Sequence, residues 1–341
     1  MNTTKKLITL LLAVMALTGC HDSKDEPEPV ICPVEETTLY LATSGFSGYP
    51  EFIVNLEGDT IYQCEDDESK IHSLVADGSD WYAVIRRGDG MFNVLKNGNL
   101  IHMTGEKLWG FTVEDGIVYT VQENESSNTI WLCRNFERLY EVPSNAYYNT
   151  FSVDHGSVVM GVYDEKPCYW YNGEIITIEG LEGGFDWVYG IDKKGDDLLI
   201  TYQDIPTGKN MYWWKGAVHE FSSNFAPSGS RIINGHAYIW GETATNQTVG
   251  GVERVPAVYI DGVETILSDS RGYRVAGLVV YDADTYFLVK HSSGAQSYIY
   301  KNLEAITLPD VEIPDFYKPY YGDKCSLGKI GIKCFAVVRK Q

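Results

Sequence analysis

Aromatic rings stand beside carboxylates in several short segments that separate apolar runs. Trp109 lies in one segment, Tyr147 and Tyr148 in a second, and Asp186 with Trp187 in a third. An exposed ring beside a carboxylate suits a sugar, because the ring packs on the apolar face of a pyranose and the carboxylate accepts hydrogen bonds from its hydroxyls. The other interpretation is structural, since buried rings contribute ~150–250 Å² of packing surface each. The candidate ligand-binding set also includes Tyr273, Tyr320 and Tyr321.

Catalytic motifs do not accompany these rings. The sequence contains no Gly-x-Ser-x-Gly elbow, no His-Glu-x-x-His pair and no phosphate-binding glycine loop. Its histidines are scattered, and abundance of carboxylates does not show that two of them face one substrate. We therefore expect no catalytic residue, no cofactor and no metal site. A glycosidase or lyase that uses two of the many carboxylates is the alternative.

A weak repeat of about forty residues must position these residues. Each copy holds an apolar strand, a Gly turn, a second apolar strand, a variable loop, an aromatic strand, a tight turn and a last strand. The Gly turns recur at Gly78, Gly116, Gly156, Gly195 and Gly235. The aromatic strand and its turn recur at 92–98, 130–135, 168–173, 211–216, 257–262 and 297–302, with a degenerate copy at 52–58.

Four strands per copy predict an all-β fold, a β-propeller. Asn-Gly and Asp-Gly turns between apolar strands are strong hairpin signals, because tight hairpin turns need positive φ. Six full copies lie between Ile71 and Pro309, with strand-like material at both ends. Joining the two ends into one composite blade gives seven four-stranded blades and removes the open sheet edges. The C-terminal strands expected for it are Ser326–Ile330 and Lys333–Val338.

One strand is left over in that arrangement, because Thr38–Thr43 also competes for a place. Six or eight blades therefore remain alternatives. The longest insertion inside a copy, Gly241–Val255, is rich in Gly and Thr and is expected to be a mobile loop. It and Tyr202–Asn210 are predicted to leave their blades at the same edge, where they would suit partner contact.

The first 20 residues form a secretory signal of the lipoprotein type. Lys5 and Lys6 precede an apolar core, and Leu17-Thr18-Gly19-Cys20 closes it. This end resembles a bacterial lipobox, which implies cleavage before Cys20 and lipidation, including palmitate, at that residue. Residues 21–36 are acidic and contain prolines, so we expect a disordered tether. Residues 37–341 form the propeller.

The tether and the repeat together resemble uncharacterised, propeller-like lipoproteins of Bacteroides-type bacteria. Acidic residues directly after Cys20 resemble the surface-export signal of such proteins, which implies an outer-membrane, cell-surface location. A periplasmic face is the alternative. Asp59-Thr60-Ile61 resembles their O-glycosylation motif, so Thr60 is a candidate modification site.

The net charge bears on the choice of binding partner, and the cysteines bear on disulfide bonding. The chain carries 47 acidic against 27 basic side chains, a net charge of −20, so nucleic acid is a poor partner. Besides Cys20, six cysteines in an exported chain permit disulfides, and Cys325 with Cys334 is one pairing that neighbouring strands would allow. Buried free thiols are the preferred interpretation for Cys133 and Cys168. Cys32 and Cys64 complete the six cysteines, and the sequence does not assign them a pairing.

The sequence thus favours a lipid-anchored, monomeric binding module that presents one propeller face to a glycan or an envelope protein. A propeller-type carbohydrate-active enzyme is the first alternative. A scaffold without a small ligand, inside an envelope complex, is the second.

Overall fold

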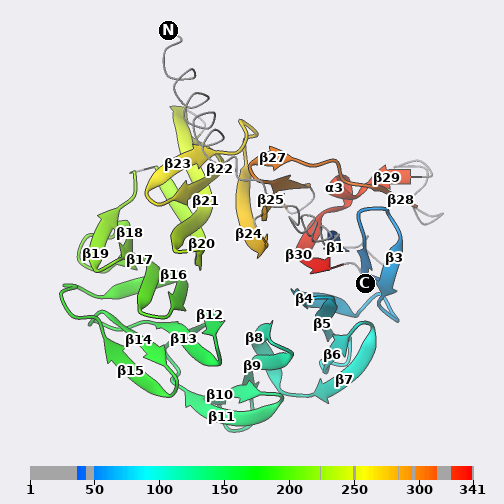
Figure 1. Cartoon of the computed structure of the whole chain (residues 1–341), viewed down its shortest axis with the longest axis horizontal. Coiled ribbons are helices and arrows are strands. Elements are labelled where there is room, and N and C mark those ends of the chain that lie inside the picture. The colour runs from blue at the N-terminus through cyan, green and yellow to red at the C-terminus, as the bar shows by residue number, and fades with distance from the viewer. Residues whose placement is uncertain are drawn as a thin grey trace, which may run out of the picture. The chain divides into compact units, whose positions relative to one another are not determined.

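A computed structural model describes residues 37–43, 50–222, 224–248, 251–282, 284–293, 296–312 and 324–339. Seven four-stranded antiparallel sheets stand around a common centre (Figure 1), which confirms the seven-blade β-propeller. The predicted signal segment 1–20 and tether 21–36 lie outside the described residues, and so does Cys32. The part of the chain that is described has no helix with the length and apolarity that a bilayer span requires.

Each of the first six blades is a run of four consecutive strands. Blade 1 comprises β4 (Lys70–Asp77), β5 (Asp80–Arg86), β6 (Phe92–Lys96) and β7 (Asn99–Thr104). Blade 2 comprises β8 (Lys107–Glu114), β9 (Ile117–Asn124), β10 (Thr129–Arg134) and β11 (Glu137–Val142). Blade 3 comprises β12 (Ala146–Asp154), β13 (Ser157–Val162), β14 (Cys168–Tyr171) and β15 (Glu174–Thr177).

The second half of the ring repeats the pattern. Blade 4 comprises β16 (Phe185–Lys194), β17 (Asp197–Asp204), β18 (Asn210–Trp214) and β19 (Ala217–Glu220). Blade 5 comprises β20 (Phe225–Ile233), β21 (His236–Thr248), β22 (Gly251–Ile260) and β23 (Val263–Ile266). Blade 6 comprises β24 (Tyr273–Tyr281), β25 (Asp284–His291), β26 (Ser297–Lys301) and β27 (Glu304–Ala305).

Blade 7 joins the two ends of the chain, as the composite closure required. Its order is β30 (Ile332–Arg339), β1 (Thr37–Thr43), β2 (Phe52–Val54) and β3 (Thr60–Gln63). The antiparallel register of β1 and β30 runs from Thr37↔Arg339 to Thr43↔Ile332. The C-terminus supplies one strand and the N-terminus three, which gives Thr38–Thr43 the second place in the blade.

The expected strand at Ser326–Ile330 is wrong. β28 (Asp310–Glu312) pairs with β29 (Lys324–Ser326) outside the blades, and the chain then forms the short helix α3 (Leu327–Ile330). Leu327 and Ile330 are buried in the cluster that also contains strand residues of blades 6 and 7. One helical turn therefore buries Leu327 and Ile330, and Thr38–Thr43 finds its place in blade 7.

Blade 7 is locked to blade 1 by a buried carboxylate. Glu51, which is 1% exposed, accepts a hydrogen bond of 2.7 Å from the Ile71 N–H. The same carboxylate forms an ion pair of 2.5 Å with Lys333 of β30. A buried carboxylate is tolerated only when such partners compensate its lost hydration.

The tight turn between the third and fourth strands explains the recurring asparagine. Asn172 has φ of 46°, and its side-chain oxygen accepts the Val158 N–H of the second strand at 2.8 Å. The same bond, at 2.8–3.0 Å, is made by Asn97 to Trp81, Asn135 to Val118, Asp261 to Ala237 and Asn302 to Thr285. The residue thus provides both the left-handed turn and an acceptor that joins neighbouring hairpins.

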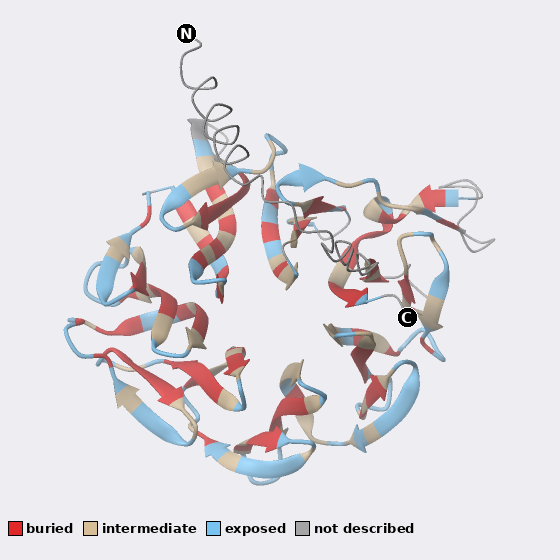
Figure 2. Cartoon of the chain, in the orientation of Figure 1, coloured by how far each residue is buried: buried red, intermediate tan, exposed pale blue. Residues whose placement is uncertain are grey.

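Apolar burial concentrates on the second and third strands of each blade, whereas the fourth strands are mostly exposed (Figure 2). The second strand β5, for example, contains five consecutive buried residues, Trp81–Ile85. Its two faces pack on the neighbouring sheets on both sides, so apolar and polar residues do not alternate along this strand.

The expectation of a loop at Gly241–Val255 is wrong for the described residues, whereas its mobility stays a prediction. β21 continues to Thr248 and β22 begins at Gly251, so the insertion extends a β-hairpin beyond its blade. Alternating Thr and Val residues suit such a ladder. Tyr202–Asn210 is also a connection between second and third strands, so both insertions do leave their blades at the same edge.

The described cysteines are unpaired. Cys64, Cys133, Cys168 and Cys325 are buried free thiols, and Cys334 is a half-buried one. The pairing of Cys325 with Cys334 is therefore wrong for this structure. Burial raises the pKa of the Cys133 thiol to about 11, which keeps it protonated and inert at neutral pH.

Candidate functional site

The antiparallel topology gives the ring two faces. The loop face holds the connections from blade to blade, the starts of the first strands and the connections between second and third strands. The turn face holds the two tight turns of each blade. The first strands lie next to the centre of the ring (Figure 1). Every predicted ring residue that is described lies at the start of a first strand, hence on the loop face.

A β-bulge near the loop face interrupts the first strand of every blade. Single extra residues stand between paired neighbours in six of them, at His72, Trp109, Tyr189, Ser228, Ala276 and Lys333, and blade 4 has a second one at Asp186. In blade 3 the register shifts between Tyr147 and Ser152. Each of the six is exposed or half-buried, whereas the residue before it is buried. A bulge re-aims a side chain out of the ladder, and this ring of positions is where the loop face acquires its chemistry.

Tyr147 and Trp187 form the first aromatic pair. Their ring centroids are 5.1 Å apart across blades 3 and 4. The Tyr147 hydroxyl donates to the Asp186 carbonyl at 2.8 Å, and burial together with the Asp186 charge raises the pKa of that phenol. Trp187 is 51% exposed, and the Asp186 side chain is exposed beside it. The pair offers an open indole next to a solvated carboxylate.

Trp109 and Tyr148 form the second pair, across blades 2 and 3. Their ring centroids are 5.9 Å apart, and Trp109 is 38% exposed. The Trp109 indole N–H donates to Glu123 at 2.7 Å, and Lys107 Nζ lies 3.7 Å from the indole centroid. One face of this indole therefore already carries a cation, unlike that of Trp187.

Trp109 also lines a cleft between blades 1 and 2 with a volume of about 600 Å³. Its walls include His72 of β4, Arg86 at the end of β5, Phe92 of β6 and Lys107 of β8. Sequence reasoning missed this cleft, because its residues come from separate segments and none stands in a recognised motif. The spacing between His72 and Trp109, close to one repeat, is the only signal that links two of them.

The remaining predicted residues do not join either pair. Tyr273 is 7% exposed, and its ring lies 4.8 Å from that of His291 and 5.4 Å from that of Tyr298. Its packing inside blade 6 favours the structural interpretation. Tyr320 and Tyr321 lie outside the described residues. Thr60 begins β3 on the turn face and is exposed, and its modification stays a prediction.

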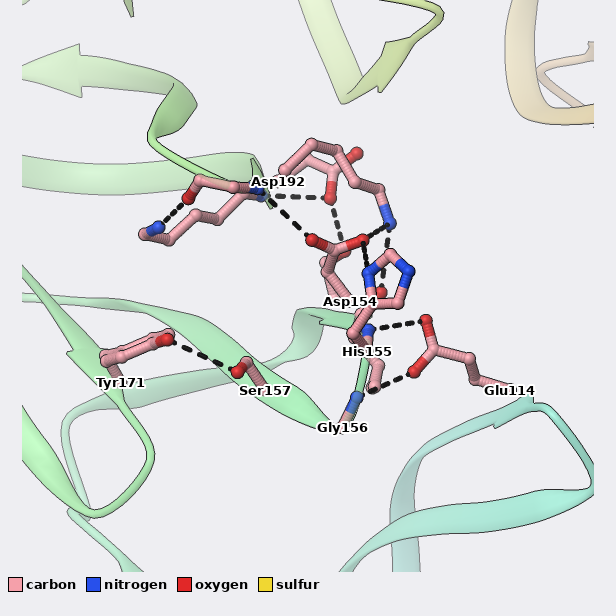
Figure 3. A network of polar contacts seen from close by, with 12 residues as sticks. Glu114, Asp154, His155, Gly156, Ser157, Tyr171 and Asp192 are labelled. Carbon is pink, nitrogen blue, oxygen red and sulfur yellow. Dashed lines mark hydrogen bonds and ion pairs between the residues drawn. The ribbon is translucent and has the colours of Figure 1, made fainter.

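Carboxylates on the turn face join neighbouring blades. Glu114 accepts the N–H groups of His155 and Gly156 at 3.0 and 2.9 Å, and the Asp154 carboxylate lies 3.2 Å from the His155 ring (Figure 3). Asp154 also binds Lys194 of the next blade at 3.0 Å. A visible sequence signal existed here, since Asp77, Glu114 and Asp154 each stand one or two residues before a Gly turn.

Deeper in this network, one acid bridges three blades. Asp192 is 1% exposed, accepts the Ile232 N–H of blade 5 at 2.8 Å and bonds the Ser152 hydroxyl of blade 3. Because its lone pairs are engaged by protein donors, we assign Asp192 a structural role. Within the described ranges, no group of three or more His, Cys, Asp and Glu side chains is placed to hold a metal ion.

Comparisons with known proteins support the architecture. No protein-family profile matches the sequence, and no curated protein matches it. The β-propeller domain of the Trilobed protease from Pyrococcus furiosus superimposes with a TM-score of 0.55 at 12% identity, over 82% of this chain and 96% of that one. That domain is described as having an open velcro topology, whereas β1 and β30 close the ring here.

Two other structures extend the comparison. Pyrococcus horikoshii acylaminoacyl peptidase gives a TM-score of 0.53 at 12% identity, over 89% of this chain and 63% of the peptidase. BamB from Moraxella catarrhalis gives a TM-score of 0.44 at 10% identity, over 77% of this chain and 78% of BamB. At such identities the likeness to the Trilobed protease domain and to the peptidase establishes the propeller fold alone.

Proposed function

We propose that the chain is a non-catalytic binding module whose loop face holds a glycan. The observation that carries the proposal is the Tyr147–Trp187 pair with Asp186 beside it. An indole that is 51% exposed forfeits much of the stabilisation that its burial would give. A sugar that packs on the indole recovers that stabilisation, while the Asp186 carboxylate accepts hydrogen bonds from its hydroxyls.

The proposal includes the place of the module in the cell. Lipidation at Cys20 holds the chain to the outer membrane, on the cell surface, and residues 21–36 serve as the tether. Several acyl chains contribute ~0.8 kcal/mol per buried methylene and together give stable anchoring. Labelling cells with a fatty-acid analogue tests this: the protein takes up label, and the Cys20→Ala variant does not. Equal labelling of the two would contradict the anchor.

A glycan-array and turnover screen on the purified protein tests the binding role. We expect one class of polysaccharide to bind without release of product. Trp187→Ala should weaken that binding at least tenfold and leave the melting temperature within about 1 °C, because an exposed ring contributes little to the core. Ile175→Ala is the matched control, since Ile175 is 49% exposed on the outer strand β15.

Other outcomes would overturn the proposal. If Trp187→Ala lowered the melting temperature by many degrees and left the affinity intact, the ring would be a packing element. Appearance of new reducing ends or unsaturated sugars would assign the chain to the carbohydrate-active enzymes instead. Absence of any bound saccharide, with one protein captured by crosslinking in membranes, would favour the scaffold.

A further inference from the structure

We propose that the cleft between blades 1 and 2 is the subsite for the anionic group of an acidic saccharide, held by Arg86 and Lys107. The inference rests on the proposed glycan-binding function and specifies its ligand class. The cleft opens on the loop face, has a volume of about 600 Å³ and is lined by two of the bulged residues, His72 and Trp109. That volume accommodates a small ligand of one or two rings.

Trp109 fixes the position of one cation. Its indole N–H is held by Glu123 at 2.7 Å, and the Tyr148 ring lies 5.9 Å from its own ring. The Lys107 ammonium lies 3.7 Å from the indole centroid, within the range of a cation–π contact. Trp109 therefore serves as a support for Lys107, and the ammonium keeps its donors available toward the cleft.

Arg86 supplies the second cation. Among the described residues no carboxylate lies within ion-pair distance of its guanidinium, although the protein carries 47 acidic side chains against 27 basic ones. Its side chain is exposed and lines the cleft with Lys107. A planar guanidinium with five donors binds a carboxylate or sulfate in a bidentate manner.

Two cations act on His72 in this cleft. Burial, with the Lys333 and Arg86 charges, holds the pKa of His72 below its usual value, although a hydrogen bond to the Leu108 backbone acts in the opposite direction. Because Glu51 already pairs with Lys333, Arg86 and Lys107 are the two basic side chains of the cleft wall that an anionic group would meet.

The rim of the same cleft carries carboxylates, and these select the ligand class. Asp89 lies on the rim, paired with Arg87 at 3.0 Å, and Glu125 stands on the adjacent loop of blade 2. An acidic sugar suits both the cations and the carboxylates of the cleft, because its anionic group would bind Arg86 and Lys107 while its hydroxyls would donate hydrogen bonds to the carboxylates of Asp89 and Glu125. A nucleic acid would place phosphates against these carboxylates, which costs binding energy.

Calorimetric titration of the purified protein tests the assignment. The probes are tetragalacturonate, a heparin-derived tetrasaccharide and methyl-esterified tetragalacturonate, which lacks the charge. We expect at least one acidic probe to bind tenfold or more tightly than the ester. Arg86→Gln and Lys107→Gln should each raise its Kd at least tenfold, and both substitutions are at exposed or half-buried positions. Lys96→Gln, which removes a cation at the turn-face end of β6 in the same blade, should change the Kd less than twofold.

The outcomes separate this inference from the function on which it rests. If the ester bound as tightly as the acidic probes and Arg86→Gln left the Kd unchanged, the anionic subsite would be refuted while glycan binding stood. Loss of that binding in Trp187→Ala would then place the ligand on blades 3 and 4 alone. If neither the acidic probes nor the neutral glycans of the array bound, both proposals would be refuted.

Discussion

Blade 4 departs from the turn that blades 1, 2, 3, 5 and 6 share, and this departure allows a gain of stability. Lys215 occupies the turn position with φ of 50°, so the backbone is already left-handed. The register Leu199↔Trp214 places Leu198 opposite Lys215, where the other blades have the N–H that bonds the Asn or Asp side chain. Lys215→Asn supplies that acceptor without a change of backbone.

The magnitude follows from three terms. A new hydrogen bond contributes about 1 kcal/mol net. The tolerance of Asn for the left-handed region adds about 0.5 kcal/mol. Against these, the contact of the Lys215 ammonium with the Trp214 ring, at 5.0 Å, is lost, which costs about 0.5 kcal/mol at an exposed site. We expect a net gain of about 1 kcal/mol, or about 2 °C in melting temperature.

Thermal unfolding followed by circular dichroism measures this change, and the reverse exchange is its control. Asn172→Lys removes the 2.8 Å bond to Val158 and should lower the melting temperature by a similar amount. Lys215→Ala loses the contact with Trp214 and gains no acceptor, so it should destabilise. If Lys215→Asn failed to raise the melting temperature while Asn172→Lys lowered it, the acceptor would not be what the turn asparagine contributes.

Three further predictions concern two contacts between blades and one contact within blade 1. Glu51→Ala should lower the free energy of unfolding by about 2–3 kcal/mol in urea titration, because it leaves the Ile71 N–H without its acceptor while Lys333 keeps access to water. Gly190→Ala should destabilise similarly in the same assay, since an added Cβ would lie 2.5 Å from the Ser230 backbone nitrogen, whereas Gly195→Asn, at a turn with open space around it, should be tolerated. Hydrogen bonds from Lys96 and Asn97 hold the pKa of Asp80 below its usual value, so its contribution is full above about pH 4 and is lost as the pH falls through the lowered pKa. Urea titrations at pH 7 and pH 3 should therefore show a smaller loss for Asp80→Asn than for the wild type, and an equal loss would contradict this account.

The architecture was predictable because its repeat is carried by local chemistry. Asn-Gly and Gly turns predict hairpins from local sequence alone, and the spacing of these turns predicts how many residues make up one blade. The ends were harder, because the short pattern Leu327-Gly328-Lys329-Ile330 does not decide between a strand and a helical turn. Its helical outcome depends on cluster contacts with blades 6 and 7, which are not local.

The site was predictable only in part, for a related reason. Rings such as Trp187 could be placed on the loop face once the blade was known, because they begin first strands. The pairing of Tyr147 with Trp187 and of Tyr148 with Trp109 depends on the stacking of neighbouring blades, which sequence spacing does not give. Lys107 and Trp109 are two residues apart on one strand, so their contact is local, but the cleft that they line also needs residues of blade 1.

The bulges explain how one repeat can carry variable chemistry on a constant fold. The extra residue of each first strand takes no place in the ladder, so its side chain can change without loss of a pairing contact. In four blades the next residue is glycine, at Gly110, Gly190, Gly229 and Gly277. At the first three an added Cβ would approach a neighbouring atom within 2.4–2.6 Å, so these glycines are required by packing.

The bulged residue before each glycine can vary in size, and it ranges from Ala276 to Trp109. His72, Trp109, Tyr189 and Lys333 carry rings or charge, whereas Ser228 and Ala276 on blades 5 and 6 are small. A ligand should therefore engage the part of the loop face that runs from blade 7 to blade 4, which contains both the cationic cleft and the exposed indole of Trp187.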